Sequence, residues 1–192
     1  MNISETLTLH KEDGPNNHRV VDLRQVSDRS NRLSLAMEEI SRTPCPRLVL
    51  ADVDGPLVLA TKYGWPGKTF PQESADFIKK VISMEDTRLV IVTSRPNDNL
   101  FRGKAIRSQL KEQGINAEQI MSPGSGIVFP VFKLYVAFTD PNRRLNLEDA
   151  RSFVFLGDGL LDRVLCNRIV ERRPKGSTNT FVRFPQAFPF PF

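Results

Sequence analysis

The 192-residue chain has few cysteines and lacks long apolar runs, and each shortage excludes a class of protein. Its two cysteines, Cys45 and Cys166, stand without neighbouring metal ligands, which argues against a disulfide scaffold and a cysteine-based metal site. No apolar run approaches the roughly 18 residues that a membrane-spanning helix needs. Residues 1–13 are polar and include early acids, so they fit neither a secretory signal nor a transit peptide. We therefore expect a cytoplasmic protein with no membrane partner.

Basic residues outnumber acidic ones in this chain. It contains 27 Lys and Arg against 22 Asp and Glu, for a net charge of +5. Such an excess favours anionic partners, and it leaves both phosphorylated metabolites and nucleic acid open because charge attraction is not specific. Hydrophobic residues make up 40% of the chain, which is enough for a real core. The oligomeric state stays open.

Continuous apolar runs predict strands that are buried on both faces of a parallel sheet. They occur at residues 47–51, 88–92 and 152–156, with shorter candidates at 117–121 and 180–184. Helices are expected between them, at residues 71–82, 101–113 and 131–138. Strands that alternate with helices predict an α/β fold, a three-layer α/β/α sandwich around a doubly wound, mostly parallel sheet.

The composition divides the chain into three parts. Residues 1–45 are expected to form a polar N-terminal extension, partly disordered, with a short helix near 31–42. Residues 46–184 carry the predicted sheet and form the expected catalytic domain. Residues 185–192 alternate Phe and Pro, which excludes an interior strand. The favoured interpretation of this tail is an extended cover over an apolar groove or another subunit, and the alternative is a peptide ligand for a partner domain.

Polar residues follow three of the predicted strands at the point where each strand ends. The segments are Asp52-Val53-Asp54-Gly55, Thr93-Ser94-Arg95 and Gly157-Asp158, the last with Asp162 four residues after Asp158. In a parallel sheet, sites form outside the carboxyl ends of the strands. A carboxylate such as Asp52 can attack phosphorus, and Asp54 can then protonate the leaving oxygen. Clustered carboxylates repel one another, so Mg²⁺ is expected to hold them ionised, with Asp158 as a further ligand.

Phosphoryl transfer also calls for a hydroxyl donor and a cation. Thr93 supplies the hydroxyl, and the best candidate for the cation is Lys133, the only Lys or Arg between Lys111 and Arg143. Each segment alone has an ordinary alternative. Asp52 to Gly55 fits a plain loop or a calcium turn, Thr93 fits a strand-end cap, and Lys133 fits a solvated side chain. Together they favour a phosphoryl-transfer site.

In these motifs the chain resembles the haloacid dehalogenase superfamily of phosphatases, from about Arg47 to Phe184. The family's first motif, Asp-x-Asp-Gly-Thr-Leu after a hydrophobic strand, is matched by residues 52–57. Its Thr or Ser, its Lys and its Gly-Asp with a further Asp are matched in order by Thr93, by Lys133, and by Gly157-Asp158 with Asp162. Three of the four motifs thus contribute acidic or basic side chains to the expected site.

The resemblance implies a Rossmannoid fold and a role for each matched residue. Asp52 would be the nucleophile and Asp54 the general acid and base. Mg²⁺ would lie between Asp52, the backbone carbonyl of Asp54, and Asp158, with Asp162 supporting the metal shell. We expect Gly55, Ser94, Arg95 and Trp65 to contact the substrate.

One residue departs from the family pattern. Pro56 stands where the family commonly has Thr or Val. Proline lacks a backbone donor and stiffens the turn, and we expect a modest effect because both Asp side chains are intact. The alternative to an active phosphatase is therefore a catalytically weak binding or regulatory module. Dehalogenase chemistry is disfavoured because it needs no acid or base at the Asp54 position.

The expected substrate is a phosphorylated molecule that an open site admits. The intervals 54–70 and 93–133 are too short for a large cap, which leaves a flap at residues 57–67. Its Trp65 can stack on a base or sugar, or pack on the domain. Residues 89–162 look most like the polynucleotide 3′-phosphatase branch, through Val-Thr-Ser-Arg-Pro at 92–96, a basic helix, Gly-Ile at 114–115 and Gln-Ile-Met-Ser-Pro at 119–123. The basic stretches of the chain are compatible with a substrate that carries a nucleic-acid 3′ end. They are equally compatible with a helix face exposed to solvent.

Overall fold

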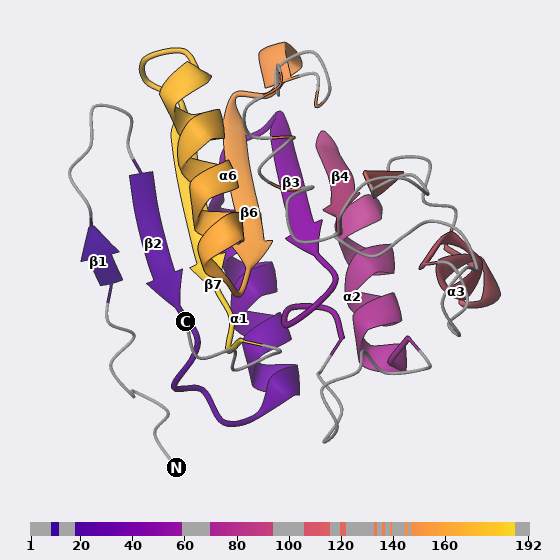
Figure 1. The fold of residues 1–192 in the computed structure, drawn as a ribbon. Helices are drawn as coiled ribbons and strands as arrows, with labels where there is room; N and C mark the ends of the chain where they lie inside the picture. The colour runs from indigo at the N-terminus through magenta and orange to yellow at the C-terminus, as the bar shows by residue number, and fades with distance from the viewer. Residues whose placement is uncertain are drawn as a thin grey trace.

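The computed structural model describes residues 9–11, 18–58, 70–93, 106–115, 120–121, 133, 136, 139, 145 and 147–186. These residues build one twisted sheet with helices packed on both faces (Figure 1).

The sheet has seven strands in the order β1-β2-β7-β6-β3-β4-β5. In that order they are Leu9–Lys11, His18–Asp22, Thr178–Arg183, Ser152–Gly157, Arg47–Asp52, Thr87–Val92 and Ile120–Met121. All neighbours pair in parallel except β1, which pairs antiparallel with β2 at one edge. Every residue of β3 and β6 is buried, as expected for central strands with helices on both sides. The α/β class and the mostly parallel sheet are therefore confirmed.

Helices cover both faces of the sheet and complete three layers. On one face α1 (Arg29–Arg42) and α2 (Gln72–Ile82) share a core with Val49 and Ala51 of β3. On the other face α6 (Leu160–Arg172) packs with Leu48 and Leu50. Figure 1 shows α6 in front of the sheet and α1 behind it. Because successive residues of a strand point to opposite faces, each central strand contributes side chains to the cores on both faces.

The remaining helical segments are short. Helix α3 covers Ile106–Glu112 within the helix expected at 101–113, residues 101–105 lie outside the described residues, and Gly114 has a φ of +71° after the helix end. The 3₁₀ turn η2 covers Leu147–Asp149. Lys133 and Val136 have helical conformation, and the rest of the helix expected at 131–138 lies outside the described residues. None of the described helices combines the length and the apolar character that crossing a membrane requires.

The N-terminal part of the chain enters the sheet. The helix expected near 31–42 is present as α1, and Asp28 caps it by accepting a hydrogen bond from the N–H of Asn31 at 2.8 Å. A poorly ordered arm was expected before it, yet His18–Asp22 forms β2 and pairs along β7 over five residues. The reason is a short alternation that reaches both cores, with Val21 on the α1 face and Val20 on the α6 face.

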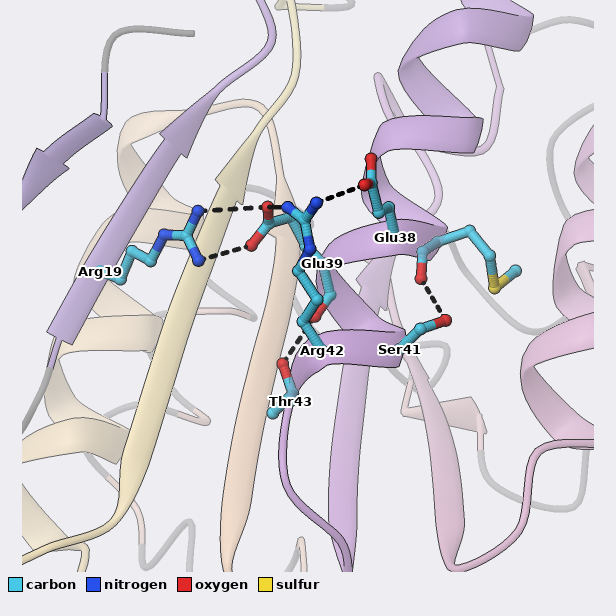
Figure 2. A network of polar contacts seen from close by, with 7 residues as sticks. Arg19, Glu38, Glu39, Ser41, Arg42 and Thr43 are labelled. Atoms are coloured by element: carbon cyan, nitrogen blue, oxygen red, sulfur yellow. Dashed lines mark hydrogen bonds and ion pairs between the residues drawn. The ribbon is translucent and has the colours of Figure 1, made fainter.

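A buried acid ties α1 to this strand. Glu39 is only 4% exposed, and its carboxylate accepts hydrogen bonds from Arg19 of β2 while contacting Arg42 one turn on at 3.3 Å (Figure 2). The Arg19 Nη1 to Glu39 Oε2 distance is 3.0 Å. The C-terminal end of α1 is held separately, because the Arg47 guanidinium donates to the carbonyls of Ile40, Ser41 and Thr43. In the described part of the chain before β3, β2 thus belongs to the sheet and α1 packs on one of its faces.

Two features near the C-terminus complete the comparison with the sequence. Helix α6 had not been expected, although Leu165, Cys166, Ile169 and Val170 form an apolar stripe at helical spacing and are buried. The expected last strand is β7, and Phe184 after it is 1% exposed. Most of the Phe/Pro tail, residues 187–192, lies outside the described residues, and the division of the chain at 45/46 and 184/185 stays a prediction.

Candidate active site

The order of the strands puts a topological switch point between β3 and β6. These neighbours are parallel, but the chain leaves β3 toward β4 through α2 on one face and leaves β6 toward β7 through α6 on the other face. Where adjacent connections depart in opposite directions, the carboxyl ends of the two strands are left uncovered, and α/β proteins bind ligands there. Asp52 is the last residue of β3, and Asp158 directly follows β6.

Lys133 bridges two buried carboxylates at this switch point. Its Nζ lies 2.6 Å from Oδ2 of Asp52 and 2.6 Å from Oδ1 of Asp162. The side chains of all three are nearly inaccessible, with 8%, 2% and 1% exposed respectively. The other oxygen of Asp52, Oδ1, accepts a hydrogen bond from the N–H of Val53 at 2.8 Å. The lysine singled out in the sequence therefore contacts the expected nucleophile directly.

Asp162 is fixed by the start of its own helix. It is the third residue of α6, and its Oδ2 accepts hydrogen bonds from the N–H groups of Asp158 at 2.9 Å and Gly159 at 3.2 Å. These donors belong to the helix N-terminus, which favours a negative charge. The side chain also packs on Gly157, where an added Cβ would lie 2.6 Å from the Cβ of Asp162. Glycine at 157 thus lets the helix approach β6 closely enough for Asp162 to meet Lys133.

Asp158 completes a group of three carboxylates. One oxygen from each of Asp52, Asp158 and Asp162 lies within 4.8 Å of the others, an arrangement that could hold a metal ion. Asp158 lies against the backbone of Gly55 on the turn after β3. The two motifs that are farthest apart in the sequence are therefore in contact.

The charge balance fits a divalent cation. Four acids act at this place, counting Asp54, against one described cation, Lys133. Burial raises the pKa of Asp52 well above its usual range; the negative charge of Asp162 raises it further, and Lys133 only partly offsets this. The pKa of Lys133 is raised: burial works against its charge, and Asp52 and Asp162 outweigh burial. A hard cation with oxygen ligands would let the carboxylates ionise together, and Mg²⁺ has that preference.

Asp54 sits on a tight turn that the chain closes with its own backbone. The N–H of Gly55 donates to the carbonyl of Val58 at 3.0 Å, and the N–H of Val58 donates to the carbonyl of Val53 at 2.7 Å. Gly55 has a φ of +88°, which favours glycine there. The third bond runs from the N–H of Leu57 to Val53, so none of these bonds needs a donor at Pro56. The carboxylate of Asp54 is outside the three-carboxylate group, and its backbone carbonyl was the expected ligand.

Two residues that the sequence did not single out, Arg29 and Ser74, donate hydrogen bonds to the carbonyls of this turn. Arg29, at the start of α1, donates to the carbonyls of Leu57 and Pro56, the latter at 3.4 Å, and to Oγ of Ser74 at 2.5 Å. The hydroxyl of Ser74 donates in turn to the carbonyl of Leu57 at 2.6 Å. Burial lowers the pKa of Arg29. The sequence did not predict a role for Arg29 or Ser74. The pattern that could have indicated it was weak, because an arginine and a serine at the starts of two helices are ordinary.

Of the other expected site residues, the structure describes some, and the rest lie outside the described residues. Thr93 is fully buried directly after β4, whose last residue Val92 pairs with Asp52. Gly55 lies on the turn and contacts Asp158 rather than open space. Ser94, Arg95 and Trp65 lie outside the described residues, and so do most of the flap at residues 57–67 and most of the interval 93–133 that was expected to be too short for a large cap. Their expected contacts with substrate stay predictions.

Comparison with known proteins gave no match. No protein-family model, no curated protein and no solved structure matches the chain. We therefore infer the function from the geometry of the site and from the motifs in the sequence.

Proposed function

We propose that the chain is a Mg²⁺-dependent phosphomonoesterase of the haloacid dehalogenase type, with Asp52 as the nucleophile. One observation carries the proposal: a buried carboxylate at the switch point of the sheet contacts a buried lysine at 2.6 Å and lies within 4.8 Å of two further carboxylates. A nucleophile, a cation and a metal-ligating group at one place are the parts that phosphoryl transfer needs.

The proposed reaction has two steps, and Asp54 serves both. In the first, a carboxylate oxygen of Asp52 attacks phosphorus, and the ester oxygen leaves with a proton from Asp54, so that an aspartyl phosphate remains. In the second, Asp54 takes a proton from water, which attacks the same phosphorus and releases phosphate with Asp52 restored. Asp158 and Asp52 would hold Mg²⁺, which would neutralise charge on the phosphoryl oxygens. Lys133 orients Asp52 and favours its ionised form, and Asp162 keeps Lys133 in place.

The hydrogen bonds of the turn favour an active enzyme over a binding module. The module was suggested by Pro56, because proline lacks a backbone donor. The three bonds that close the turn come from residues 55, 57 and 58, so proline at 56 removes no bond from it. The carbonyl of Pro56 still serves as an acceptor for Arg29. We therefore expect the turn to hold Asp54 as firmly with Pro at position 56 as it would with another residue there.

Hydrolysis of p-nitrophenyl phosphate tests the proposal. We expect Mg²⁺-dependent turnover that Asp52→Asn abolishes, because the amide cannot form the acyl phosphate. Asp76→Asn is the matched control, since Asp76 is exposed on α2 and interacts with Gln72. Turnover that survives Asp52→Asn would sink the mechanism. A silent panel of phosphate esters together with measurable Mg²⁺ binding would instead favour the binding module.

A further inference from the structure

Two large hydrophobic side chains are exposed among the described residues, and one of them lies beside the candidate site. Leu160 is 72% exposed and Ile82 is 47% exposed. Ile82 is the last residue of α2, which leads into β4, so it lies near the amino ends of the strands and away from the site. Leu160 is the first residue of α6 and follows Asp158 by two positions. A single exposed leucine is ordinary on a protein surface, so its place decides whether it can have a role.

The position of Leu160 is set by the residues on both sides of it. Asp162, two positions later, contacts Lys133 at 2.6 Å and accepts hydrogen bonds from the N–H groups of Asp158 and Gly159. Because two residues of chain span at most about 7 Å, the Cα of Leu160 lies within that distance of the Cα of Asp158. Leu160 is therefore held close to the candidate metal group.

The turn that carries Leu160 is also open to solvent. The side chains of Asp52 and Asp162 are only 2% and 1% exposed, whereas Gly159 is half-buried and a Cβ added to it would meet nothing within 4 Å. Figure 1 shows the start of α6 at the carboxyl end of β6. A substrate with its phosphate group at Asp52 must keep the rest of its structure outside the buried carboxylates, and this turn is one described side with room for it.

The leucine side chain has no part in the packing of the described domain. Leu160 belongs to neither of the two hydrophobic cores, although Leu165 one turn and more along the same helix is fully buried. An exposed apolar side chain gains free energy when a ligand covers it with apolar surface, because both surfaces then leave water. A polar group of a ligand would gain nothing from the same contact. Leu160 can therefore discriminate between substrates by what is attached to the phosphate group.

We propose that Leu160 is a specificity-determining residue that contacts an apolar group of the leaving alcohol while the phosphate group lies at Asp52. The substrate class is then a phosphate monoester with alkyl or aromatic carbon close to the ester oxygen, and not an ester of a small polyol. The inference rests on the proposed function and deepens it. The three carboxylates and Lys133 determine where the phosphate group lies, and Leu160 selects what it is attached to.

Two phosphonates of equal length test this contact without turnover. Butylphosphonate ends in a methyl group, and 3-hydroxypropylphosphonate carries a hydroxyl group at the same place. Neither can be hydrolysed by the proposed mechanism, because carbon replaces the ester oxygen that would leave. Their affinities for the protein with Mg²⁺ are measured by calorimetry. We expect butylphosphonate to bind about fivefold more tightly, as burial of one apolar carbon predicts.

Three variants assign the preference to the leucine. Leu160→Asn keeps the size of the side chain but makes it polar, and it should bring the affinity ratio toward one. Leu160→Phe offers more apolar surface and should increase the ratio. Ile82→Asn is the matched control, because Ile82 is the other exposed large hydrophobic residue and should leave the ratio unchanged. Both positions are exposed, so the variants should fold, and thermal melting checks that they do.

The outcomes separate this proposal from the proposed function. Equal binding of the two phosphonates, binding of neither, or a preference that survives Leu160→Asn would overturn the role of Leu160 even if p-nitrophenyl phosphate is hydrolysed. The same holds if Ile82→Asn lowers the ratio as much as Leu160→Asn does. A preference that Leu160→Asn removes and Leu160→Phe increases would support the role even if no phosphate ester is turned over.

Discussion

The backbone of Gly55 lies directly against the side chain of Asp158, so that a Cβ on residue 55 would come within 2.5 Å of the Cβ of Asp158. The contact joins the turn after β3 to the turn after β6, which are the two sides of the candidate metal group. Four expected outcomes follow from this site.

Gly55→Ala should destabilise the protein and weaken Mg²⁺ binding. Residue 55 has a φ of +88°, and the added methyl group must also displace Asp158. Gly176→Ala is a matched control because Gly176 has the same φ of +88° with nothing within 4 Å of an added Cβ. Urea unfolding should show a loss for Gly55→Ala that exceeds the control by about 1–3 kcal/mol, the usual cost of overpacking. Equal losses of unfolding free energy in the two variants would mean that Asp158 moves aside at no cost, which would contradict the close contact.

Lys133→Met should cost about 3–5 kcal/mol of stability near neutral pH, because it leaves two buried carboxylates without their partner. Adding Asp52→Asn to this variant should recover part of the loss, since one of the stranded charges is then removed. Lys79→Met on α2 is the control for an exposed lysine. Chemical denaturation measures all of these, and a loss no larger than that of Lys79→Met would contradict the buried ion pair.

Stabilisation by Mg²⁺ should grow with pH. Burial and the charge of Asp162 raise the pKa of Asp52, so its contribution to stability is present below the ordinary value of about 4 and is lost as pH rises through the folded-state pKa. Mg²⁺ binds the ionised carboxylate and offsets this loss. We therefore expect a larger rise in melting temperature on adding Mg²⁺ at about pH 8 than at about pH 5. In Asp52→Asn the difference between the two conditions should shrink.

Arg29→Lys should lower kcat more than it raises KM. Lysine keeps the charge but cannot reach the carbonyls of Pro56 and Leu57 and the hydroxyl of Ser74 together, so the turn that carries Asp54 loosens. Ser74→Ala should act in the same direction because it removes the other donor to Leu57. Ser30→Ala is the control, as Ser30 lies beside Arg29 and bonds the exposed Glu73. Steady-state kinetics would refute this role if the three variants behaved alike.

The central strands and the site carboxylates were predictable because their signals are local. A buried parallel strand needs a continuous apolar run, and β3, β4 and β6 each have one that ends in polar residues. Parallel strands bring their carboxyl ends to one edge, so Asp52 and Asp158 could be placed near each other before any coordinates. The weaker signals failed: the five residues of β2 and the helix α6 were not expected.

What the sequence by itself determined is the set of elements with strong local patterns and the kinds of side chain at their ends. Only the tertiary structure decided which of those side chains meet. Lys133 contacts Asp52 across 81 positions of the chain, and no local pattern reports such a contact. Arg183 of β7 likewise lies two strands from Asp52 of β3 only because β6 stands between β7 and β3 in the sheet.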